Sequence, residues 1–299
     1  MYKGYKIAAV VPAHNEAVHI KEVIVTMPDL VDIIAITDDK SSDNTFEIAS
    51  STGDTRVFVN RHEVNTGVGG AIITAHSEAI IHGSDINVVF AGDGQIDPHY
   101  ITKLLDPIIE GFYGFTKGNR LFSSQSHRGM PKYRLFGNYV LSYMHKAVSG
   151  YWHINDPQNG YTAIKTDILN EVNYETLSGG YEFENDLLTR LNEYYIPVSD
   201  IPIPARYLDE VSGIDLKKVI PALLKNFIVS AVTRIYRKYI KTKKVIPILL
   251  SAIVIFATIY TTYQIFSLHI LNVVLGVAVV IASLIILFIY DYKSTPKKW

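Results

Sequence analysis

The chain of 299 residues contains no cysteine. Disulfide bonds, thiolate metal sites and a cysteine nucleophile are therefore excluded. Charge of either sign is not in excess, because the formal net charge is −1 at pH 7. The chain thus lacks the global basic field that is typical of nucleic-acid-binding proteins. The remaining function classes are those whose site chemistry uses oxygen and nitrogen side-chain groups, and which do not require a strongly basic protein.

Two common nucleotide-binding motifs are also missing. An apolar run at residues 7–11 predicts a central parallel strand, and a G-x-G-x-x-G motif after it would indicate a dinucleotide-binding dehydrogenase. The run is followed instead by the residues Pro12-Ala13-His14-Asn15-Glu16, and no Walker loop is present in the chain. A dehydrogenase and a P-loop enzyme are therefore both disfavoured.

Apolar runs alternate with helical stretches through the first hundred residues. The runs cover residues 7–11, 33–36, 57–59 and 88–90, and helical stretches are expected near 18–27, after 45 and at 71–81. A further strand is expected to end at Phe115-Thr116-Lys117-Gly118-Asn119-Arg120, and a helix at 130–148. This alternation predicts an α/β fold with a doubly wound, mostly parallel sheet.

Each of the first four apolar runs ends in polar or glycine residues. Since the carboxyl ends of parallel strands meet at one edge of the sheet, these residues are expected to form a binding cleft there. The cleft would contain Asn15, Glu16, Asp38, Asp39, Asn65, Gly67, Asp93 and Gln95.

Asp93 and Gln95 follow the fourth run, and glycines flank Asp93 on both sides. Oxygen ligands on a tight turn suit a divalent cation that also holds phosphates. An ordinary Asp/Gly turn after a strand is the alternative, since such turns are common in α/β proteins.

The ordered set of motifs resembles family 2 glycosyltransferases, which have the GT-A (Rossmann-like) nucleotide-sugar fold. It resembles most the dolichyl-phosphate mannose and glucose synthases and the bacterial polyprenyl-phosphate glycosyltransferases. The similarity runs from about residue 6 to 212, and the set is specific although no single motif is. The motifs are Pro12-Ala13-His14-Asn15-Glu16, Asp38-Asp39-Lys40-Ser41-Ser42-Asp43, Asn65-Thr66-Gly67 and Gly92-Asp93-Gly94-Gln95.

The resemblance implies a nucleotide diphosphate sugar donor, linked to UDP or GDP, and a divalent cation, Mg²⁺ or Mn²⁺. Asp39 would contact the base, Asp93 would be catalytic, and Asp93 with Gln95 would hold the metal. The donor-binding residues would be Pro12, Ala13, Asn15, Glu16, Asp39, Gly67 and Asp93. Ala91 departs from the pattern, because the family usually has an acid there. Weaker donor binding and a catalytically inactive homologue both remain open for that reason.

The second half of the matched region would supply the acceptor site, for a polyprenyl (dolichyl) phosphate. The residues that the resemblance implies for binding acceptor or diphosphate are Arg120, Arg134, Asp156, Asn159, Arg206 and Ser212. Asp186 occupies the place of a general base in relatives that glycosylate a hydroxyl. Glu182 and Glu184, on the same expected helix, are interpreted as surface acids.

Two uncharged apolar segments, 245–266 and 270–290, are each long enough to cross a bilayer. They predict a two-helix transmembrane hairpin, and a buried hairpin in a soluble core is the alternative. Lysines and arginines flank both segments, which predicts that both termini and the catalytic domain are cytoplasmic, at the cell membrane. The first residues contain no apolar stretch before a cleavage site, so no signal peptide is expected.

The predicted domains are a glycosyltransferase domain at 1–212, basic amphipathic helices at the membrane interface at 213–244, two spans within 245–290 and a cytoplasmic tail at 291–299. The amphipathic stretch suits anionic headgroups, with a partner protein as the alternative. A homo-oligomer through the hairpin is also possible.

The sequence therefore predicts an inverting, membrane-anchored transferase that moves a sugar from a nucleotide diphosphate sugar to a polyprenyl phosphate. Two alternatives remain. One is a transferase that glycosylates a hydroxyl of a lipid-linked glycan or polysaccharide, with Asp186 as base. The other is a non-catalytic, membrane-tethered binder of sugar nucleotides.

Overall fold

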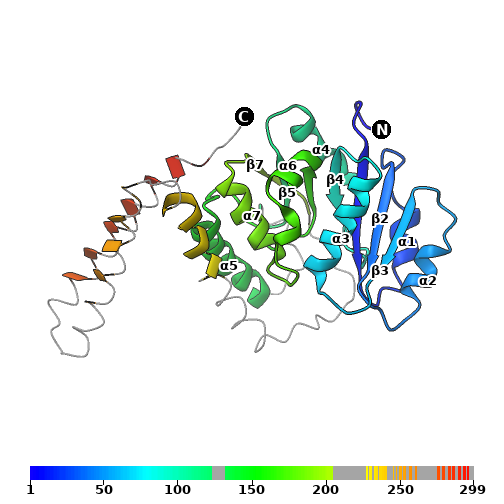
Figure 1. The fold of residues 1–299 in the computed structure, drawn as a ribbon, viewed down its shortest axis with the longest axis horizontal. Coiled ribbons are helices and arrows are strands. Elements are labelled where there is room, and N and C mark those ends of the chain that lie inside the picture. The colour runs from blue at the N-terminus through cyan, green and yellow to red at the C-terminus, as the bar shows by residue number, and fades with distance from the viewer. Residues whose placement is uncertain are drawn as a thin grey trace.

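The computed structural model describes residues 1–122 and 132–204, together with scattered positions between 227 and 295. Its described part is a layered α/β domain in which helices cover both faces of one sheet (Figure 1). The strands are β1 (Ile7–Ala13), β2 (Ile33–Asp38), β3 (Val57–Arg61), β4 (Ile86–Val89), β5 (Phe115–Asn119), β6 (Thr162–Lys165) and β7 (Val198–Pro202). The α-helices are α1 (Ile20–Val25), α2 (Thr45–Ser50), α3 (Val68–Ile81), α4 (Ile101–Ile109), α5 (Lys132–Ser149), α6 (Thr166–Glu171) and α7 (Phe183–Glu193).

The sheet has seven strands in the order β3-β2-β1-β4-β6-β5-β7. β1 pairs in parallel with β2 and β4, and β5 pairs in parallel with β7. Only β6 runs against its neighbours, because it is antiparallel to both β4 and β5. The mostly parallel sheet predicted from the alternating runs is confirmed, whereas β6 was not predicted because its residues, Thr162–Lys165, do not form an apolar run.

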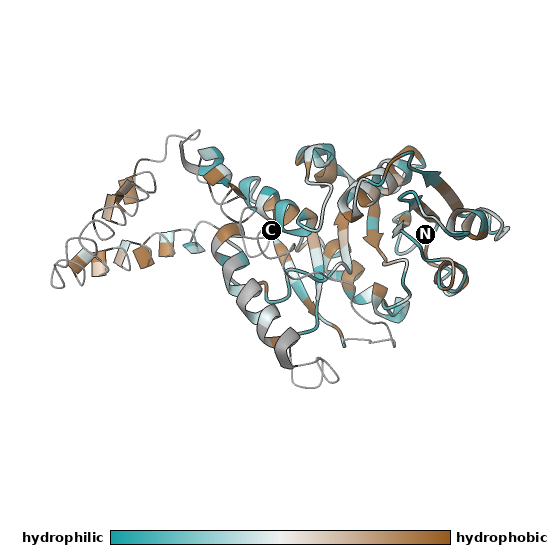
Figure 2. Ribbon diagram, turned by 90° about the horizontal axis from the view of Figure 1, so that it is seen from below, coloured by the Kyte–Doolittle hydropathy of each residue, from teal (hydrophilic) through white to brown (hydrophobic). Residues whose placement is uncertain are grey.

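The apolar runs lie in the sheet because both of its faces are covered. Successive residues of β1 point to opposite faces, so Val11 belongs to one hydrophobic core and Val10 to the other. Helices α1, α2 and α4 supply the first core, and α3, α6 and α7 supply the second. Figure 2 shows the hydrophobic residues of the strands inside these layers. Strands buried on both faces are continuous apolar runs, and the sequence has this pattern at all four predicted positions.

The carboxyl ends of β1, β2, β4 and β5 meet at one edge of the sheet, which positions the site. The amino end of β6 reaches the same edge because β6 runs in the opposite direction. The turn that precedes β6 therefore joins the residues that follow the parallel strands.

Part of the C-terminal segment packs against α7. Asn192 of α7 is buried, and its Oδ1 accepts hydrogen bonds from Arg234 and Lys238. Its Nδ2 donates a hydrogen bond to Thr295 Oγ1 at 3.2 Å. None of the described helices is both long and apolar enough to cross a bilayer. The two predicted spans fall largely outside the described residues, and they stay a prediction.

The start of α3 packs directly against the loop before α7, and glycine permits this contact. A Cβ atom at Gly69 would lie 2.4 Å from the carbonyl oxygen of Ser178 and 2.8 Å from Cβ of Phe183. The backbone N–H of Gly70 donates to the carbonyl of Gly179 at 3.0 Å. These contacts connect the start of α3, at the edge of the sheet, to α7.

We expect Gly69→Ala to destabilise the fold by about 1–3 kcal/mol, because the added methyl group collides with backbone and helix propensity recovers only part of the loss. Gly137→Ala is the matched control: Gly137 is also helical, and a Cβ there meets nothing within 4 Å. Chemical denaturation of both variants measures the difference. Equal stabilities of the two variants would contradict the close contact.

Candidate active site

The Asp39 carboxylate lies at the sheet edge where β2 ends. It is 3% exposed, and it follows β2 directly. Its Oδ1 accepts hydrogen bonds from the backbone N–H of Thr66 at 2.8 Å, from Thr66 Oγ1 at 3.0 Å and from His62 Nδ1 at 2.8 Å. Its Oδ2 accepts one from the N–H of Gly67 at 2.8 Å. One carboxylate thus fixes the whole loop between β3 and α3.

These hydrogen bonds decide the ionisation of Asp39. Burial by itself would raise the pKa of Asp39, but the donors from Thr66, His62 and Gly67 outweigh it and lower that pKa below its ordinary value. Since a carboxylate only accepts, His62 donates through Nδ1, and its Nε2 accepts from the hydroxyl of Thr74 at 2.9 Å. Asp39 is therefore a fixed negative charge at neutral pH.

The loop after β1 rests on the same residue. The N–H of Asp39 donates to the carbonyl of Ala13 at 2.8 Å, and His14 Nδ1 lies 2.8 Å from the Asp39 carbonyl oxygen. Asn15 has a left-handed backbone, φ 59°, which asparagine tolerates well, and its Oδ1 accepts from the N–H of Ser42 at 2.8 Å. The predicted donor-binding residues of β1 and β2 thus form one connected surface.

The Gly92–Gln95 turn packs onto this surface. A Cβ at Gly92 would lie 2.9 Å from the carbonyl oxygen of Pro12 and 3.3 Å from Cγ of Glu16. Asp93 is half-buried, and its Oδ1 accepts from the N–H of Gln95 at 2.9 Å. The two predicted metal ligands therefore lie on one turn beside the loop after β1.

The donor set at this turn fits a magnesium-type ion. In the described part of the chain, no cluster of three or more His, Asp or Glu side chains could hold a metal. A site with one carboxylate and one amide oxygen is of the kind that Mg²⁺ or Mn²⁺ occupies when phosphate and water complete the coordination. Asp93 and Gln95 supply those two groups.

Farther along the sheet edge, Arg120 forms an ion pair with the buried Asp156. The guanidinium donates through Nε at 2.7 Å and Nη2 at 3.0 Å to the two oxygens of Asp156, which is 1% exposed. Burial would raise the pKa of Asp156, but Arg120 lowers it below its usual value. The pair holds the turn before β6 against the end of β5.

Asn159, in the same turn, is 6% exposed. Its Oδ1 accepts from the N–H of Tyr161 at 3.1 Å, whereas its Nδ2 has no hydrogen-bond partner among the described residues. A buried amide donor without a protein partner is rare in folded proteins and suits a ligand oxygen.

Two residues of this region were not identified as site residues from the sequence. Lys117 of β5 is fully buried and donates through Nζ to the carbonyl of Asn159. Glu184 of α7 is only half-exposed, and a Cβ at Gly160 would lie 3.8 Å from its Oε1. Glu184, interpreted from the sequence as a surface acid, is thus only partly exposed, and burial raises its pKa.

Asp186 points elsewhere on α7. Its Oδ2 accepts from the N–H of Ser178 at 3.0 Å, and burial raises its pKa while Arg190 and Arg237 oppose the shift. Two residues separate positions by about 200° around a helix, which is why Glu184 faces the turn and Asp186 does not. A base role for Asp186 stays a prediction.

Comparison with known proteins identifies the family. The family model "Glycosyl transferase family 2" matches residues 8–172, more than half of the chain. The chain belongs to glycosyl transferase family 2. The resemblance drawn from the motifs is therefore confirmed, and the protein is a glycosyltransferase.

Named relatives of this glycosyltransferase act on lipid phosphates. It is 30% identical over 215 residues to a UDP-N-acetylglucosamine–dolichyl-phosphate N-acetylglucosaminyltransferase from Methanococcus voltae, over 67% of this chain and 85% of the relative. It is 26% identical over 174 residues to polyprenol monophosphomannose synthase from Mycolicibacterium smegmatis, over 57% of this chain and 65% of the relative.

Solved structures confirm the GT-A-like fold of this family 2 glycosyltransferase. Glucosyl-3-phosphoglycerate synthase from Mycobacterium tuberculosis, in complex with Mn²⁺, UDP and phosphoglyceric acid, is similar with a TM-score of 0.59 and 20% identity. The match covers 77% of this chain and 78% of that one. At this identity the similarity establishes the fold alone.

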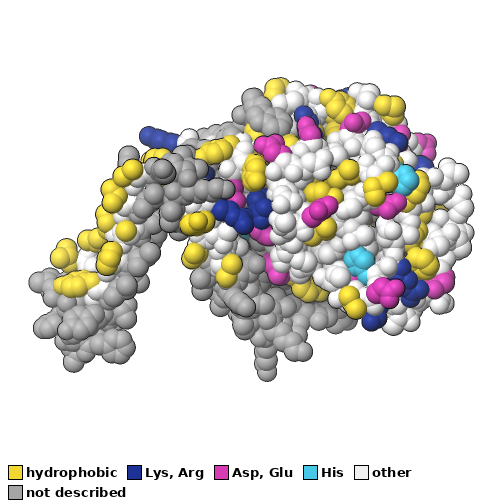
Figure 3. Space-filling model, viewed as in Figure 1, with side chains coloured by type: hydrophobic (Ala, Val, Ile, Leu, Met, Phe, Trp, Pro, Cys, Tyr) yellow, Lys and Arg dark blue, Asp and Glu magenta, His cyan; other side chains and the backbone are white. Residues whose placement is uncertain are grey.

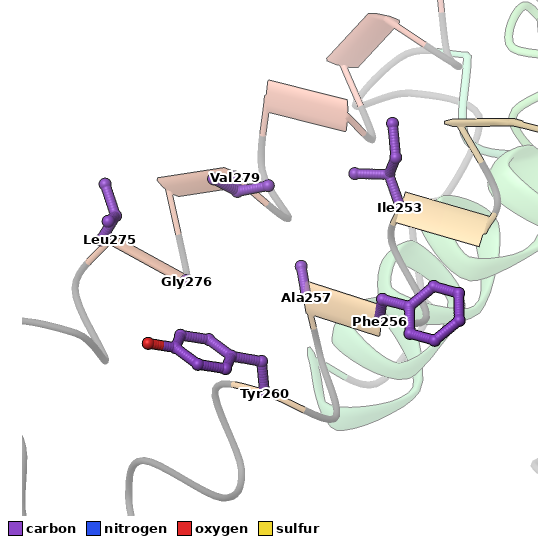
Figure 4. A pocket seen from close by; sticks show the side chains of 7 residues that line it. All are labelled: Ile253, Phe256, Ala257, Tyr260, Leu275, Gly276 and Val279. Carbon is purple, nitrogen blue, oxygen red and sulfur yellow. The ribbon is translucent and has the colours of Figure 1, made fainter.

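Some predicted acceptor residues of the glycosyltransferase cannot be placed. Arg206 and Ser212 lie outside the described residues, and so does the side chain of Arg134, whose backbone lies in the first turn of α5. A separate pocket in the C-terminal segment is lined, among the described residues, by apolar residues, Gly276 and Tyr260 (Figure 4). It contains none of the predicted site residues.

We expect Asp39→Asn to lower the free energy of unfolding by about 1–3 kcal/mol, because the amide brings N–H groups against donors that now bind a carboxylate. Because the pKa of Asp39 is lowered in the folded state, its stabilisation is present above the pKa of the unfolded chain. It is lost as the pH falls through the folded pKa. Urea denaturation at pH 7 and at about pH 3 checks both points.

The matched control is Asp29→Asn, which changes an exposed carboxylate. We expect it to alter the free energy of unfolding by less than about 0.5 kcal/mol at either pH. A wild-type stability for Asp39→Asn at pH 7 would show that the loops do not depend on this carboxylate.

Proposed function

We propose that this glycosyltransferase moves one sugar from a nucleotide diphosphate sugar to a polyprenyl (dolichyl-type) phosphate, with inversion at the anomeric carbon. The observation that carries the proposal is the union of two half-sites at one sheet edge. The Asp39 and Asp93 loops form the donor half, and the Asp156–Asn159 turn forms the acceptor half. The dolichyl-phosphate and polyprenol-phosphate relatives support the acceptor.

The donor half suits a base with a ring N–H next to a carbonyl, as in uracil and guanine. Asp39 Oδ2 accepts a single hydrogen bond that the structure records, from Gly67, so a base N–H could add a second. Pro12 and Ala13 end the neighbouring strand β1, and Asn15 and Glu16 lie in the loop that follows it. The related fold from Mycobacterium tuberculosis binds UDP, which agrees with a UDP-linked donor, and GDP remains the alternative.

Asp93 and Gln95 would hold Mg²⁺ or Mn²⁺, as that related fold is described with both ions. The ion supplies neutralisation of the charge that grows on the leaving diphosphate. Two residues of the chain make further contributions. Gly92 lets the turn approach Pro12 closely, and Asn159 Nδ2 offers a hydrogen-bond donor to a substrate oxygen.

The acceptor half suits a group that is already ionised. A phosphate monoester carries its charge near neutral pH and needs no general base. Arg120 binds Asp156 and so fixes the turn, and Arg134 and Arg206 are proposed to bring positive charge to the acceptor phosphate. The Asp186 carboxylate accepts a hydrogen bond from the Ser178 N–H, and in this proposal Asp186 is a positioning residue that removes no proton.

The C-terminal segment is proposed to hold the site at the cytoplasmic face of the cell membrane. Large hydrophobic side chains of its described residues are exposed, and Figure 3 shows them along this segment. They include Val245, Leu249, Ile253, Phe256, Tyr260, Leu275, Ile285 and Ile289. A bilayer would cover this surface, which water disfavours. The comparisons do not support association of two copies through the hairpin.

A second candidate is transfer to a hydroxyl, and Glu184 favours it. A half-buried carboxylate with a raised pKa beside the acceptor turn is the kind of group that removes a proton from a hydroxyl. The two functions give different products, because a glycosyl phosphate is cleaved by mild acid and a simple glycoside is not.

The test is transfer of radiolabelled sugar from UDP- or GDP-sugars to polyprenyl phosphate in vesicles with Mn²⁺. We expect organic-extractable label that mild acid releases. Acid-stable label would favour the hydroxyl acceptor. Absence of any labelled product from a protein that binds the nucleotide would favour a non-catalytic binder.

We expect Asp93→Ala to abolish metal-dependent transfer, by a factor of about 100 or more, since the metal loses its one carboxylate ligand. The fold should survive because Asp93 is half-buried on a turn. Circular dichroism checks the fold, and Asp29→Ala is the surface control. Wild-type turnover in Asp93→Ala would remove the proposed metal site.

A further inference from the structure

Behind the acceptor turn, Lys117 is the buried cation around which charged groups gather. It lies on the inner strand β5, between β6 and β7, and it is 0% exposed. Its ammonium donates to the Asn159 carbonyl, and so holds the turn from below. A buried lysine without a compensating role is costly, so its presence at this position requires a physical account.

The groups that face Lys117 come from every element packed around it. They are Glu184 of α7, Asp156 of the turn, Asp200 of β7, Arg120 after β5 and His145 of α5. Burial lowers the pKa of His145 to about 3, so this imidazole is neutral. Burial raises the pKa of Asp200 to about 7. Above neutral pH, three carboxylates therefore face two cations.

The interaction with Glu184 is the one that reaches the site. Among the charged groups, Glu184 has the largest effect on Lys117, and Lys117 is the main group that opposes the burial of Glu184. The Glu184 carboxylate lies against Gly160, on the same turn that Lys117 holds. One ammonium thus acts on both the backbone and the carboxylate that border the acceptor half-site.

We propose that Lys117 is a positioning residue of the transfer reaction, which fixes the Asp156–Gly160 turn through the Asn159 carbonyl and supplies a positive charge to Glu184 beside it. The inference rests on the proposed function, because it assigns Lys117 to the acceptor half of that site. Lys117 itself does not touch the substrate. It acts through the turn and through Glu184.

The proposal predicts a pH profile. Burial lowers the pKa of Lys117 to about 8, so the ammonium loses its proton in the range where enzymes are commonly assayed. As the pH rises through this value, the turn loses its donor and the three carboxylates lose one of their two cations. We expect kcat of the wild type to fall above about pH 8, while KM for the nucleotide sugar changes less than about twofold.

Lys117→Met removes the charge and keeps the length of the side chain. We expect kcat at pH 7 to fall about 10- to 100-fold, because small misplacements of reacting groups cost this much. Lys117→Arg keeps a charge that does not titrate, so it should recover part of kcat and lose the fall above pH 8. Wild-type kcat in a folded Lys117→Met variant would overturn the proposal.

Glu184→Gln tests the pair even if both Lys117 variants fail to fold. Removal of a negative neighbour lowers the pKa of Lys117 further, so the fall in kcat should move to lower pH. Glu182→Gln is the matched control, because Glu182 lies two residues before Glu184 and accepts a hydrogen bond from the Ser178 hydroxyl. We expect this variant to leave the pH at which kcat falls unchanged. An unmoved fall in Glu184→Gln would overturn the proposal. A wild type that labels no polyprenyl phosphate would instead contradict the proposed function.

Discussion

The hydrogen bonds of the Asp39 carboxylate hold the proposed donor half of this glycosyltransferase together. Asp39 binds the loop before α3 through its side chain, and the loop after β1 through its backbone. The Asp39 carboxylate accepts hydrogen bonds from the backbone N–H groups of Thr66 and Gly67. These hydrogen bonds compensate for lost hydration, which is why the charged residue can be only 3% exposed.

The proposed acceptor half differs from this arrangement, because it contains several charged side chains that compensate one another. Arg120 pairs with Asp156, and Lys117 lies among Asp156, Glu184 and Asp200. Such a network is costly to bury and is retained at sites where geometry and ionisation both matter. The donor half therefore offers a fixed frame, and the acceptor half offers groups whose charge responds to pH near neutrality.

The C-terminal segment is connected to the catalytic domain through α7. Asn192 binds Arg234, Lys238 and Thr295, and the same helix carries Glu184 two to three turns earlier. Helix α7 thus packs on the C-terminal segment at one end and borders the Asp156–Gly160 turn at the other. This arrangement suits an enzyme whose proposed acceptor has its phosphate in water and its chain in lipid.

The sequence by itself determined the family and the mostly parallel sheet, and it predicted which residues gather at the sheet edge as the donor half of the site. Residues such as Asp39 and Asp93 follow apolar runs directly, and the carboxyl ends of parallel strands have to meet at one edge. Local order along the chain was therefore enough. Arg134, Arg206 and Ser212 were named from the same pattern, and they stay predictions.

Only the tertiary structure decided which charges face the acceptor turn. Glu184 and Asp186 are two residues apart, and no local pattern shows which side of α7 is turned toward β5. That choice follows from the packing of α7 on the sheet through Phe183 and Leu187. Lys117 was hidden for the same reason: a lysine in a strand is ordinarily expected at a surface, and it is buried here because three carboxylates from distant segments surround it.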